Sequence, residues 1–421
     1  MAEIDLRQSK RILGIILLIV LLILSFIVYQ ANSKLGVFLI IGLVLGFIES
    51  HSEIGLASGY VDFFLTGSRT RLYSFLLLFA LGSLGALIVH ATAALNGALP
   101  EYLATSTQTI IPGTSAVTEV NFGLILGSFL FGVGLTLNKG CGVGTLRNTG
   151  LGQIRFILTF LFIMIGAIPG QWVKYRLDQS VIHNFSLQVY FPNIIGYQGT
   201  LILGLIVFTL LALWGVYVDR RRKKGSLTKA TSKHSSGEMK TKENNHPVLF
   251  YLLQKKWPRI ISVILITILL LVALTLTGEK LAVTYSFINP AVALFQRFGF
   301  TFNDPAFSEA LEVVNNGLLN NHVVVQNIGI VFGALLFGLL SMEFRISWGG
   351  KLKEVGLYIC SGLLMGFGVI LASGCIVGAL YSGIVNFSLS GWIVFLSMSM
   401  GIWLTVKMMN GVVSTIPAIE K

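Results

Sequence analysis

The chain has 421 residues, of which 54% are hydrophobic and only 11% are charged, and its formal net charge is +12 at pH 7. Soluble globular domains carry about 25% charged residues, so this composition excludes an ordinary soluble protein. The mean hydropathy of +0.81 indicates a chain that lies largely within a membrane.

Apolar runs close to membrane-spanning length recur along the chain. A transmembrane helix needs about 20 mostly apolar residues, with about 17 as a lower limit. We therefore predict an all-α polytopic membrane protein with nine or ten spanning helices. The runs are 12–28, a shorter one at 35–48, 72–90, 121–137, 155–173, 199–218, 260–277, 326–342, 355–372 and 391–406.

The first run follows Arg7, Lys10 and Arg11, as the core of a signal peptide would. It is longer than such a core and has no clear small-residue cleavage site. We predict an anchoring helix with its amino end in the cytoplasm of a multi-pass membrane protein.

Most of the positive charge lies in one polar stretch near the middle of the chain. Residues 219–259 contain twelve Lys or Arg and three Asp or Glu, a net charge of +9. Such a stretch between membrane spans favours a disordered cytoplasmic linker that can touch anionic lipid, and we expect no nucleic-acid binding. The linker, 219–258, separates a first membrane half, 1–218, from a second, 259–421.

The two halves share a motif. "GVGLTLNKGCGVGTLRNTG" (132–150) and "GFGVILASGCIVGALYSGI" (366–384) agree without a gap at eight of nineteen positions. Each copy lies between apolar runs and contains one of the three cysteines. The matched pairs include Gly140 with Gly374, Cys141 with Cys375, and Gly144 with Gly378.

Glycine-rich, non-helical backbone survives in a membrane only when it is buried in protein or lines a cavity. The repeated motif therefore predicts two short re-entrant or broken helices, whose amino ends offer N–H groups to an anion. Helix packing through small residues is the alternative, but packing does not require a repeated cysteine. We assign the substrate path to the two cysteines, the glycines paired above and Lys139.

The chemistry of the thiols leaves three classes of function. A cysteine in apolar surroundings has a raised pKa and stays a neutral, polarisable S–H, which suits transient binding of a sulfur-containing anion. The alternatives are a membrane thiol redox or sulfur- or selenium-handling protein, and a cuprous transporter. There is no Cys-x-x-Cys motif and no histidine in the motifs, so we expect neither a metal site nor a cofactor, and a transporter, not an enzyme. Cys360, whose counterpart in the first half is Leu126, is expected to be a packing residue.

The pair "LTLNKGCGVGTL" and "GVILASGCIVGALY", with the upstream "IIGLVLGFIESHSEIGLASGYVDFFLTG", resembles the YeeE/YedE-type sulfur-transport family of bacterial and archaeal inner-membrane proteins. The resemblance covers most of 35–172 and 326–410. It implies re-entrant helices in pseudo-symmetric halves, an hourglass-shaped interior, and uptake of thiosulfate, passed between cysteines by S–H hydrogen bonds. Cys141 and Cys375 match two of those cysteines. By analogy, a cytoplasmic sulfur-carrier protein is a candidate partner.

One position departs from that family. Aligning Tyr60-Val61-Asp62 with the family's aromatic-x-Asp places Gly55 where many relatives have a further cysteine. A related sulfur or selenium species, or another small anion, therefore stays open as the substrate. His51 and Glu53 are the nearby residues that could act on it, or could simply be solvated.

The charges near the first motif have a functional and a topological interpretation. Lys139 and Arg147 flank the predicted break and could attract an anion, although the second copy has Ser373 and Tyr381 there. For Arg155 we favour a plain cytoplasmic topology residue. The sequence is compatible with parallel or inverted halves, with passive or ion-coupled transport, and with a segment 281–296 that either enters the membrane or lies on its surface.

Overall fold

The computed structural model describes residues 2–52, 60–61, 63–64, 69–105, 107–180, 186–226, 257–348 and 354–408. Over these residues it is almost entirely helical, and ten helical segments are long and apolar enough to cross a membrane. Each apolar run in the sequence corresponds to one of them, including the short run at 35–48. The protein is thus an all-α polytopic membrane protein.

Several of the spanning helices contain a break, and a few short helices lie in the described connections between them. Their bounds are α1 (Ala2–Ala31), α2 (Ser33–His51), α4 (Arg69–Leu95), α5 (Phe122–Asn138), α6 (Gly142–Gly150), α7 (Ile154–Asp178), α8 (Pro192–Ser226), α10 (Arg259–Thr277), α11 (Ile288–Arg297), α12 (Ser308–Asn315), α13 (His322–Leu340), α14 (Val355–Leu371), the π-helix η7 (Ile376–Tyr381), α15 (Ser382–Val385) and α16 (Leu389–Met408).

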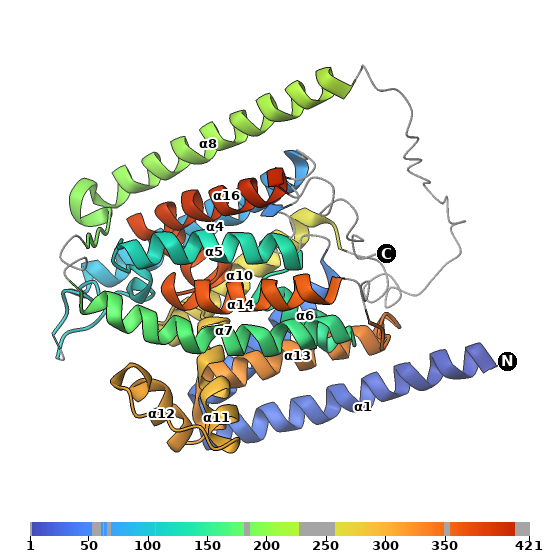
Figure 1. The fold of residues 1–421 in the computed structure, drawn as a ribbon. Coiled ribbons are helices and arrows are strands. Elements are labelled where there is room, and N and C mark those ends of the chain that lie inside the picture. Colours follow the sequence, from blue (N-terminus) through green and yellow to red (C-terminus); the bar gives the residue numbers. More distant parts are fainter. Residues whose placement is uncertain are drawn as a thin grey trace.

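The long helices run roughly side by side, so the bundle has two ends (Figure 1). We call the end where α1 begins and α8 finishes the linker end, and the other the outer end. α8 continues as a helix to Ser226, past the expected boundary at 218, and residues 227–256 of the linker lie outside the described residues.

The two helices that precede the Gly-Cys motifs pack against each other and run antiparallel. Near the outer end, Gly123 of α5 lies against Leu371, close to where α14 finishes. Nearer the linker end, Gly134 of α5 contacts Ser361 and Met365 of α14. The repeated helices therefore cross the membrane in opposite directions, which is the inverted arrangement.

Small residues set how closely the central helices approach. A Cβ atom added to Gly46 of α2 would clash with the Ile330 carbonyl of α13, and one added to Gly333 of α13 would clash with Leu43. Glycine at such contacts lets helix backbones touch, which is the main source of van der Waals packing between helices in lipid. These contacts hold α2 and α13 together at the centre of the bundle.

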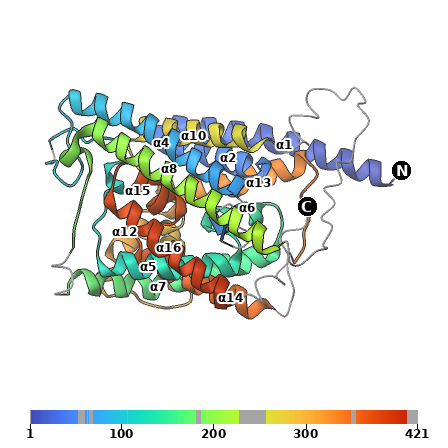
Figure 2. The same ribbon diagram turned by 90° about the horizontal axis from the view of Figure 1, so that it is seen from above.

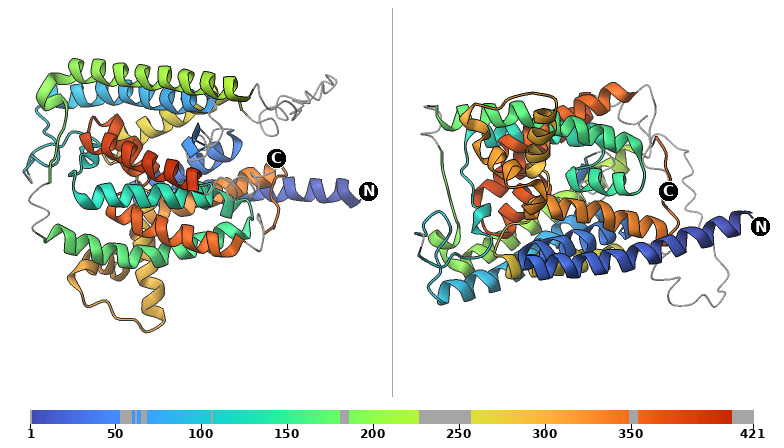
Figure 3. Two further views of the ribbon diagram at one scale, coloured as in Figure 1. Left: turned by 45° about the horizontal axis from the view of Figure 1, so that its top comes forward. Right: turned by 90° about the horizontal axis from the view of Figure 1, so that it is seen from below.

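Two long helices lie at the periphery. α8 packs beside α4 across one face of the bundle, as two views show (Figures 2 and 3), and α1 packs on α2 and α13. Only 17% of the α1 span and 11% of the α8 span is buried, in contrast to 78% of the segment Val355–Val385. The outer helices thus present apolar side chains to lipid, and the Gly-Cys segments lie in the protected interior.

Candidate functional site

The first Gly-Cys motif breaks a membrane helix, as the sequence predicts. α5 ends at Asn138, Lys139 adopts a left-handed conformation with φ of 53°, and Cys141 is the N-cap of α6. The Asn138 amide donates to the Gly140 carbonyl at 2.9 Å, and Thr145 returns to the Cys141 carbonyl. The Asn138 side chain thus gives the Gly140 carbonyl a partner, and the Cys141 carbonyl accepts from both the backbone and the hydroxyl of Thr145, as a membrane interior requires.

The second motif breaks its helix in the same way. α14 ends at Leu371, Ser373 has a φ of 54°, and Cys375 directly precedes the π-helix η7. Lys139 and Ser373, which occupy equivalent positions in the repeat, therefore adopt the same left-handed conformation. Neither residue type favours it, so the broken geometry is a property of the duplicated motif.

The motif glycines are used in different ways. Gly374 has a φ of 152°, and an added Cβ would come within 2.7 Å of the Ala379 nitrogen, so only glycine fits. At Gly144 an added Cβ would have no neighbour within 4 Å, and at Gly140 and Gly378 the nearest neighbours are at ordinary contact distance. Open space therefore adjoins the start of α6.

A third irregular segment, 278–284, lies next to both motifs. Its carbonyls are held by α13: Gln326 donates to Ala282 and Asn327 donates to Val283, at 3.0 and 2.9 Å. Thr284 is fully buried and lies so close to Gly142 that any side chain there would clash. The segment 281–296 thus enters the protein interior.

Cys375 lines a cavity of about 250 Å³ whose other walls come from segments near the outer end. Its walls combine the end of the second motif with the irregular segment and the last turns of α7. The residues that define its chemistry are Lys174, Lys280, Tyr285, Ser373, Gly374 and Cys375. We call this cavity the outer vestibule.

Two lysines make the outer vestibule cationic. Lys174 Nζ donates to the Ser373 hydroxyl at 3.0 Å and lies 5.0 Å from the centre of the Tyr285 ring. Lys280 Nζ donates to the Ser115 carbonyl at 3.0 Å. Burial, assisted by the charge of Lys174, lowers the pKa of Lys280 to about 8. A small anion that entered here would relieve the repulsion between the two ammonium groups.

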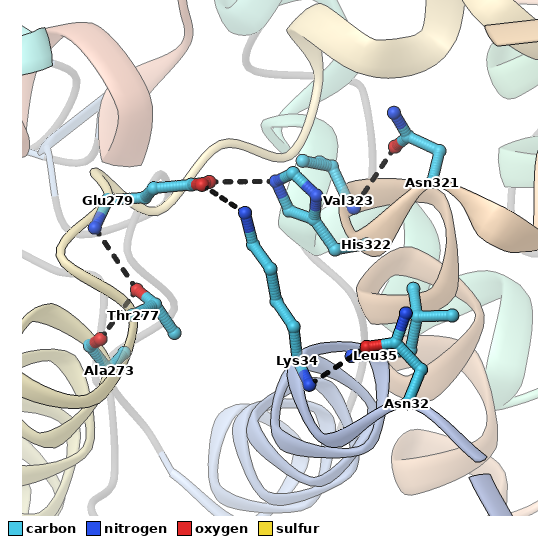
Figure 4. A network of polar contacts seen from close by, with 9 residues as sticks. All are labelled: Asn32, Lys34, Leu35, Ala273, Thr277, Glu279, Asn321, His322 and Val323. Atoms are coloured by element: carbon cyan, nitrogen blue, oxygen red, sulfur yellow. Dashed lines mark hydrogen bonds and ion pairs between the residues drawn. The ribbon is translucent and has the colours of Figure 1, made fainter. Parts of the chain in front are cut away.

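The residue before Lys280 anchors this wall of the vestibule. The Glu279 carboxylate accepts hydrogen bonds from two side chains (Figure 4). One comes from Lys34, at the start of α2, and the other, at 2.8 Å, comes from Nε2 of His322, at the start of α13. The His322 hydrogen bond is the main reason that the pKa of Glu279 is lowered to about 2, and Lys34 adds to it against the opposing effect of burial. Three elements are thereby tied together at the outer end.

Cys141 does not line the outer vestibule. Its side chain is 1% exposed and belongs to the same contiguous apolar cluster as Cys375. The two thiols are near enough to interact electrostatically, and the Cys141 sulfur also faces the N–H groups of Val143 and Gly144. The structure thus places one cysteine at the vestibule and the other deeper, at the amino end of α6.

The other charged candidates near the first motif are engaged within the protein. Lys139 is half-buried at the end of α5, and Arg147 donates to the Glu49 carbonyl at 3.1 Å, near the end of α2. His51 is fully buried and stacks on Trp257 with ring centres 4.3 Å apart. The structure brings these residues together at the linker end, away from the outer vestibule.

Cys360 lies on the exposed side of α14, opposite the face formed by Tyr358, Ser361 and Met365. The expected packing role does not fit this position, because the side chain points out of the bundle. Gly55 and Glu53 lie outside the described residues. Within the described parts of the chain, no group of His, Cys, Asp or Glu has a metal-binding arrangement.

Lys174 and Lys280 were not among the site residues predicted from the sequence. They are separated by more than one hundred residues and neither belongs to a motif. The sequence offers one sign of their role. Each lysine follows the end of an apolar run, on the side of the membrane opposite the basic linker, where few positive charges are expected. Only the packing of α7 against the irregular segment brings them together.

Broken membrane helices in inverted repeats, converging beside a cationic cavity, are characteristic of membrane transport proteins that bind a small anion near the bilayer midplane. The family model "Sulphur transport" matches residues 51–404. The chain therefore belongs to the sulphur transport family.

Relatives with assigned names fit this membership. The thiosulfate transporter TsuA of Escherichia coli is 25% identical over 377 residues, which covers 87% of this chain and 92% of the relative. The thiosulfate transporter TsuA of Spirochaeta thermophila is 28% identical over 299 residues, covering 67% and 76%. The probable transporter YedE of Escherichia coli is 26% identical over 151 residues, covering 35% and 37%.

Proposed function

We propose that this protein takes up a small sulfur-containing dianion, with thiosulfate as the first candidate, from the outer end to the linker end. The observation that carries the proposal is the outer vestibule, where two lysines and a hydroxyl surround the cavity that Cys375 lines. The names of the two TsuA relatives support thiosulfate as the substrate.

The vestibule supplies capture. A dianion between Lys174 and Lys280 gains charge-assisted hydrogen bonds, which are about twice as strong as neutral ones. It also replaces the contact in which Lys174 donates to Ser373, and the O–H of Ser373, which that contact does not use, can donate to the anion next to Cys375. Capture that exchanges existing contacts for new ones keeps binding moderate, as transport requires.

The thiols supply passage. An uncharged S–H is a weak, polarisable donor, so it holds the terminal sulfur or an oxygen of the anion without charge repulsion. We propose that the anion moves from Cys375 to Cys141 and toward the N–H groups at the start of α6. The open space at Gly144 supports this direction, because a path needs room beside the second thiol.

We further propose that the linker end faces the cytoplasm and that the protein lies in the inner membrane. The basic stretch that starts within the last turns of α8 supports this orientation through the positive-inside rule. It places the amino terminus in the cytoplasm and makes the linker end the docking face for a soluble sulfur-carrier protein.

A growth-rescue assay tests the proposal. Cells that lack other sulfur uptake would express the protein and receive thiosulfate, sulfite, sulfate or selenite separately. We expect rescue by thiosulfate, and its loss in the Cys141→Ala and Cys375→Ala variants at unchanged membrane abundance. Cys360→Ala is the matched control, because this thiol lies on the exposed face of α14. Normal rescue by both buried-cysteine variants would rule out thiol-mediated passage.

A further inference from the structure

Arg155 is a buried cation without an ion pair. It lies in the first turn of α7 at the linker end, and its side chain is 1% exposed. None of its three guanidinium nitrogens makes a hydrogen bond. The indole Nε1 of Trp348 is likewise buried without an acceptor. The two residues are joined through their backbones, since the backbone N–H of Arg155 donates to the backbone carbonyl of Trp348 at 3.1 Å.

Such a group requires an explanation. Buried polar groups in native proteins are hydrogen-bonded with few exceptions, and a buried charge left without its partner is strongly destabilising. The unsatisfied atoms at this place are donors of the guanidinium and the indole. Both lack a hydrogen-bond acceptor, and the guanidinium also lacks a paired negative charge.

The surroundings orient the guanidinium but do not neutralise it. Its carbon lies 4.2 Å from the centre of the Phe156 ring and 5.2 Å from that of Tyr358. The Tyr358 hydroxyl donates to Glu354 at 2.7 Å. The Tyr358 hydroxyl lies close enough to interact with the guanidinium, and Glu354 is within electrostatic reach of it. Neither makes a well-formed hydrogen bond with a guanidinium nitrogen.

Arg155 is also connected to the first Gly-Cys motif. The ring of Phe156, which lies beside the guanidinium, is close to Gly140: a Cβ added at Gly140 would be in van der Waals contact with it, at 3.5 Å. Thr159 donates both to the Arg155 carbonyl and to the Asn138 side chain, at 3.1 and 3.4 Å. Lys139 lies near enough to interact electrostatically with Arg155. The break before Cys141 and the start of α7 therefore form one cluster, in which Lys139 and Arg155 both lie within electrostatic reach of Glu354.

We propose that Arg155 and Lys139 form a second anion-binding subsite, on the linker side of Cys141, for an oxyanion such as thiosulfate or sulfate. The inference rests on the proposed function in that it places this subsite at the exit of the same path. Arg155 contributes a planar fork that can hold two oxygens at once, and Lys139 adds a second positive charge.

The two subsites would divide the work of transport. The outer vestibule attracts the anion, the two thiols pass it on, and the inner subsite accepts it before release at the linker end. Lys139 of the first motif and Ser373 of the second occupy equivalent positions in the repeat. At this position the inner subsite has a lysine, and the outer vestibule has a hydroxyl. A path with cations at both ends avoids trapping the anion in its middle.

The test combines transport with binding in purified full-length protein. Arg155→Met removes the charge and keeps much of the volume, and Arg155→Lys keeps the charge without the fork. The matched control is Lys407→Met, an exposed cation of α16 at the linker end. In proteoliposomes, we expect Arg155→Met to lower the maximal rate of thiosulfate uptake about tenfold, the loss of one hydrogen-bonded charge, with an unchanged external KM. Lys407→Met should match the wild type.

Calorimetric titration with sulfate gives a readout that does not depend on transport. We expect two sites in the wild type and in Lys407→Met, and one in Arg155→Met. One site in the wild type, or two in Arg155→Met, overturns the inner subsite. If the wild type transports no sulfur anion but binds sulfate at two sites that Arg155→Met reduces to one, the proposed function fails and the subsite stands. If Arg155→Met does not fold, the test is a crystal of the wild type soaked in selenate. An anomalous selenium peak at Arg155 would support the inner subsite, and the absence of such a peak would overturn it.

Discussion

The ammonium group of Lys174 donates a hydrogen bond of 3.0 Å to the hydroxyl of Ser373, two residues before Cys375. The bond joins the last turns of α7 to the broken backbone of the second motif. In the proposed function, a captured anion would accept a hydrogen bond from Lys174 in place of this contact. The proposed capture therefore depends on Lys174, which no motif contains.

Lys174→Met should weaken capture more than passage. The variant loses one charge-assisted hydrogen bond to the anion, and we expect the external KM for thiosulfate to rise about tenfold. The maximal rate should change little, because both thiols remain. Initial uptake rates at increasing thiosulfate concentration measure the two quantities. A lowered maximal rate at normal KM would contradict a role in capture.

Uptake should decline with alkaline pH because of Lys280. Its pKa is lowered to about 8, so the ammonium loses its proton as the pH rises through that value, and the anion then meets one positive charge fewer. We expect the external KM to rise between pH 7 and pH 9. Binding of an anion favours the charged form, so capture above pH 8 takes up a proton.

Lys280→Arg is the control for this pH dependence. A guanidinium stays protonated up to pH values above 12, so the variant should show a flat KM across the same range. The measurement is thiosulfate uptake by proteoliposomes at fixed internal pH. A decline that persists unchanged in Lys280→Arg would show that another group is responsible.

Much of the architecture could be predicted from the sequence, because apolar length and glycine-rich interruptions are local properties. The ten spans, the two breaks and the position of Cys141 and Cys375 at the breaks follow from such patterns. The direction of the second half could not be predicted, since it depends on whether each broken segment crosses the bilayer. The antiparallel contact of Gly134 with Ser361 and Met365 answers that question.

The vestibule and the buried arginine could not be predicted for a related reason. Lys174 and Lys280 approach each other only through tertiary packing, and the sequence analysis treated Arg155 as a topology residue because it follows a loop near the linker end. A positive charge at a helix end usually reaches water. Here the Phe156 and Tyr358 rings cover it, which a linear pattern does not reveal.

Glu279→Gln should destabilise the outer end. The carboxylate joins Lys34 and His322, and its pKa is lowered to about 2. Its contribution to stability is therefore fully present above the ordinary pKa of 4.5 and is lost as the pH falls toward 2. Since the groups are partly exposed, we expect a loss of roughly 1 kcal/mol at pH 7.

Thermal unfolding in detergent at several pH values measures this effect. The melting temperatures of the wild type and Glu279→Gln should differ at pH 7 and converge below pH 4. Glu309→Gln, which removes an exposed carboxylate of α12, is the matched control and should melt as the wild type does. A difference that stayed constant down to pH 3 would argue against the carboxylate as its source.

Gly374→Ala should disrupt the second break. Gly374 has a φ of 152°, and an added Cβ would meet the Ala379 nitrogen at 2.7 Å, so the substitution strains the backbone by roughly 1–3 kcal/mol. We expect a lower melting temperature and, because the segment that carries Cys375 must shift, a loss of thiosulfate uptake. Gly204→Ala is the control, since a Cβ there has no neighbour within 4 Å and alanine favours the helix. If Gly374→Ala melted and transported like the wild type, the left-handed turn before Cys375 would not be needed to hold the vestibule open.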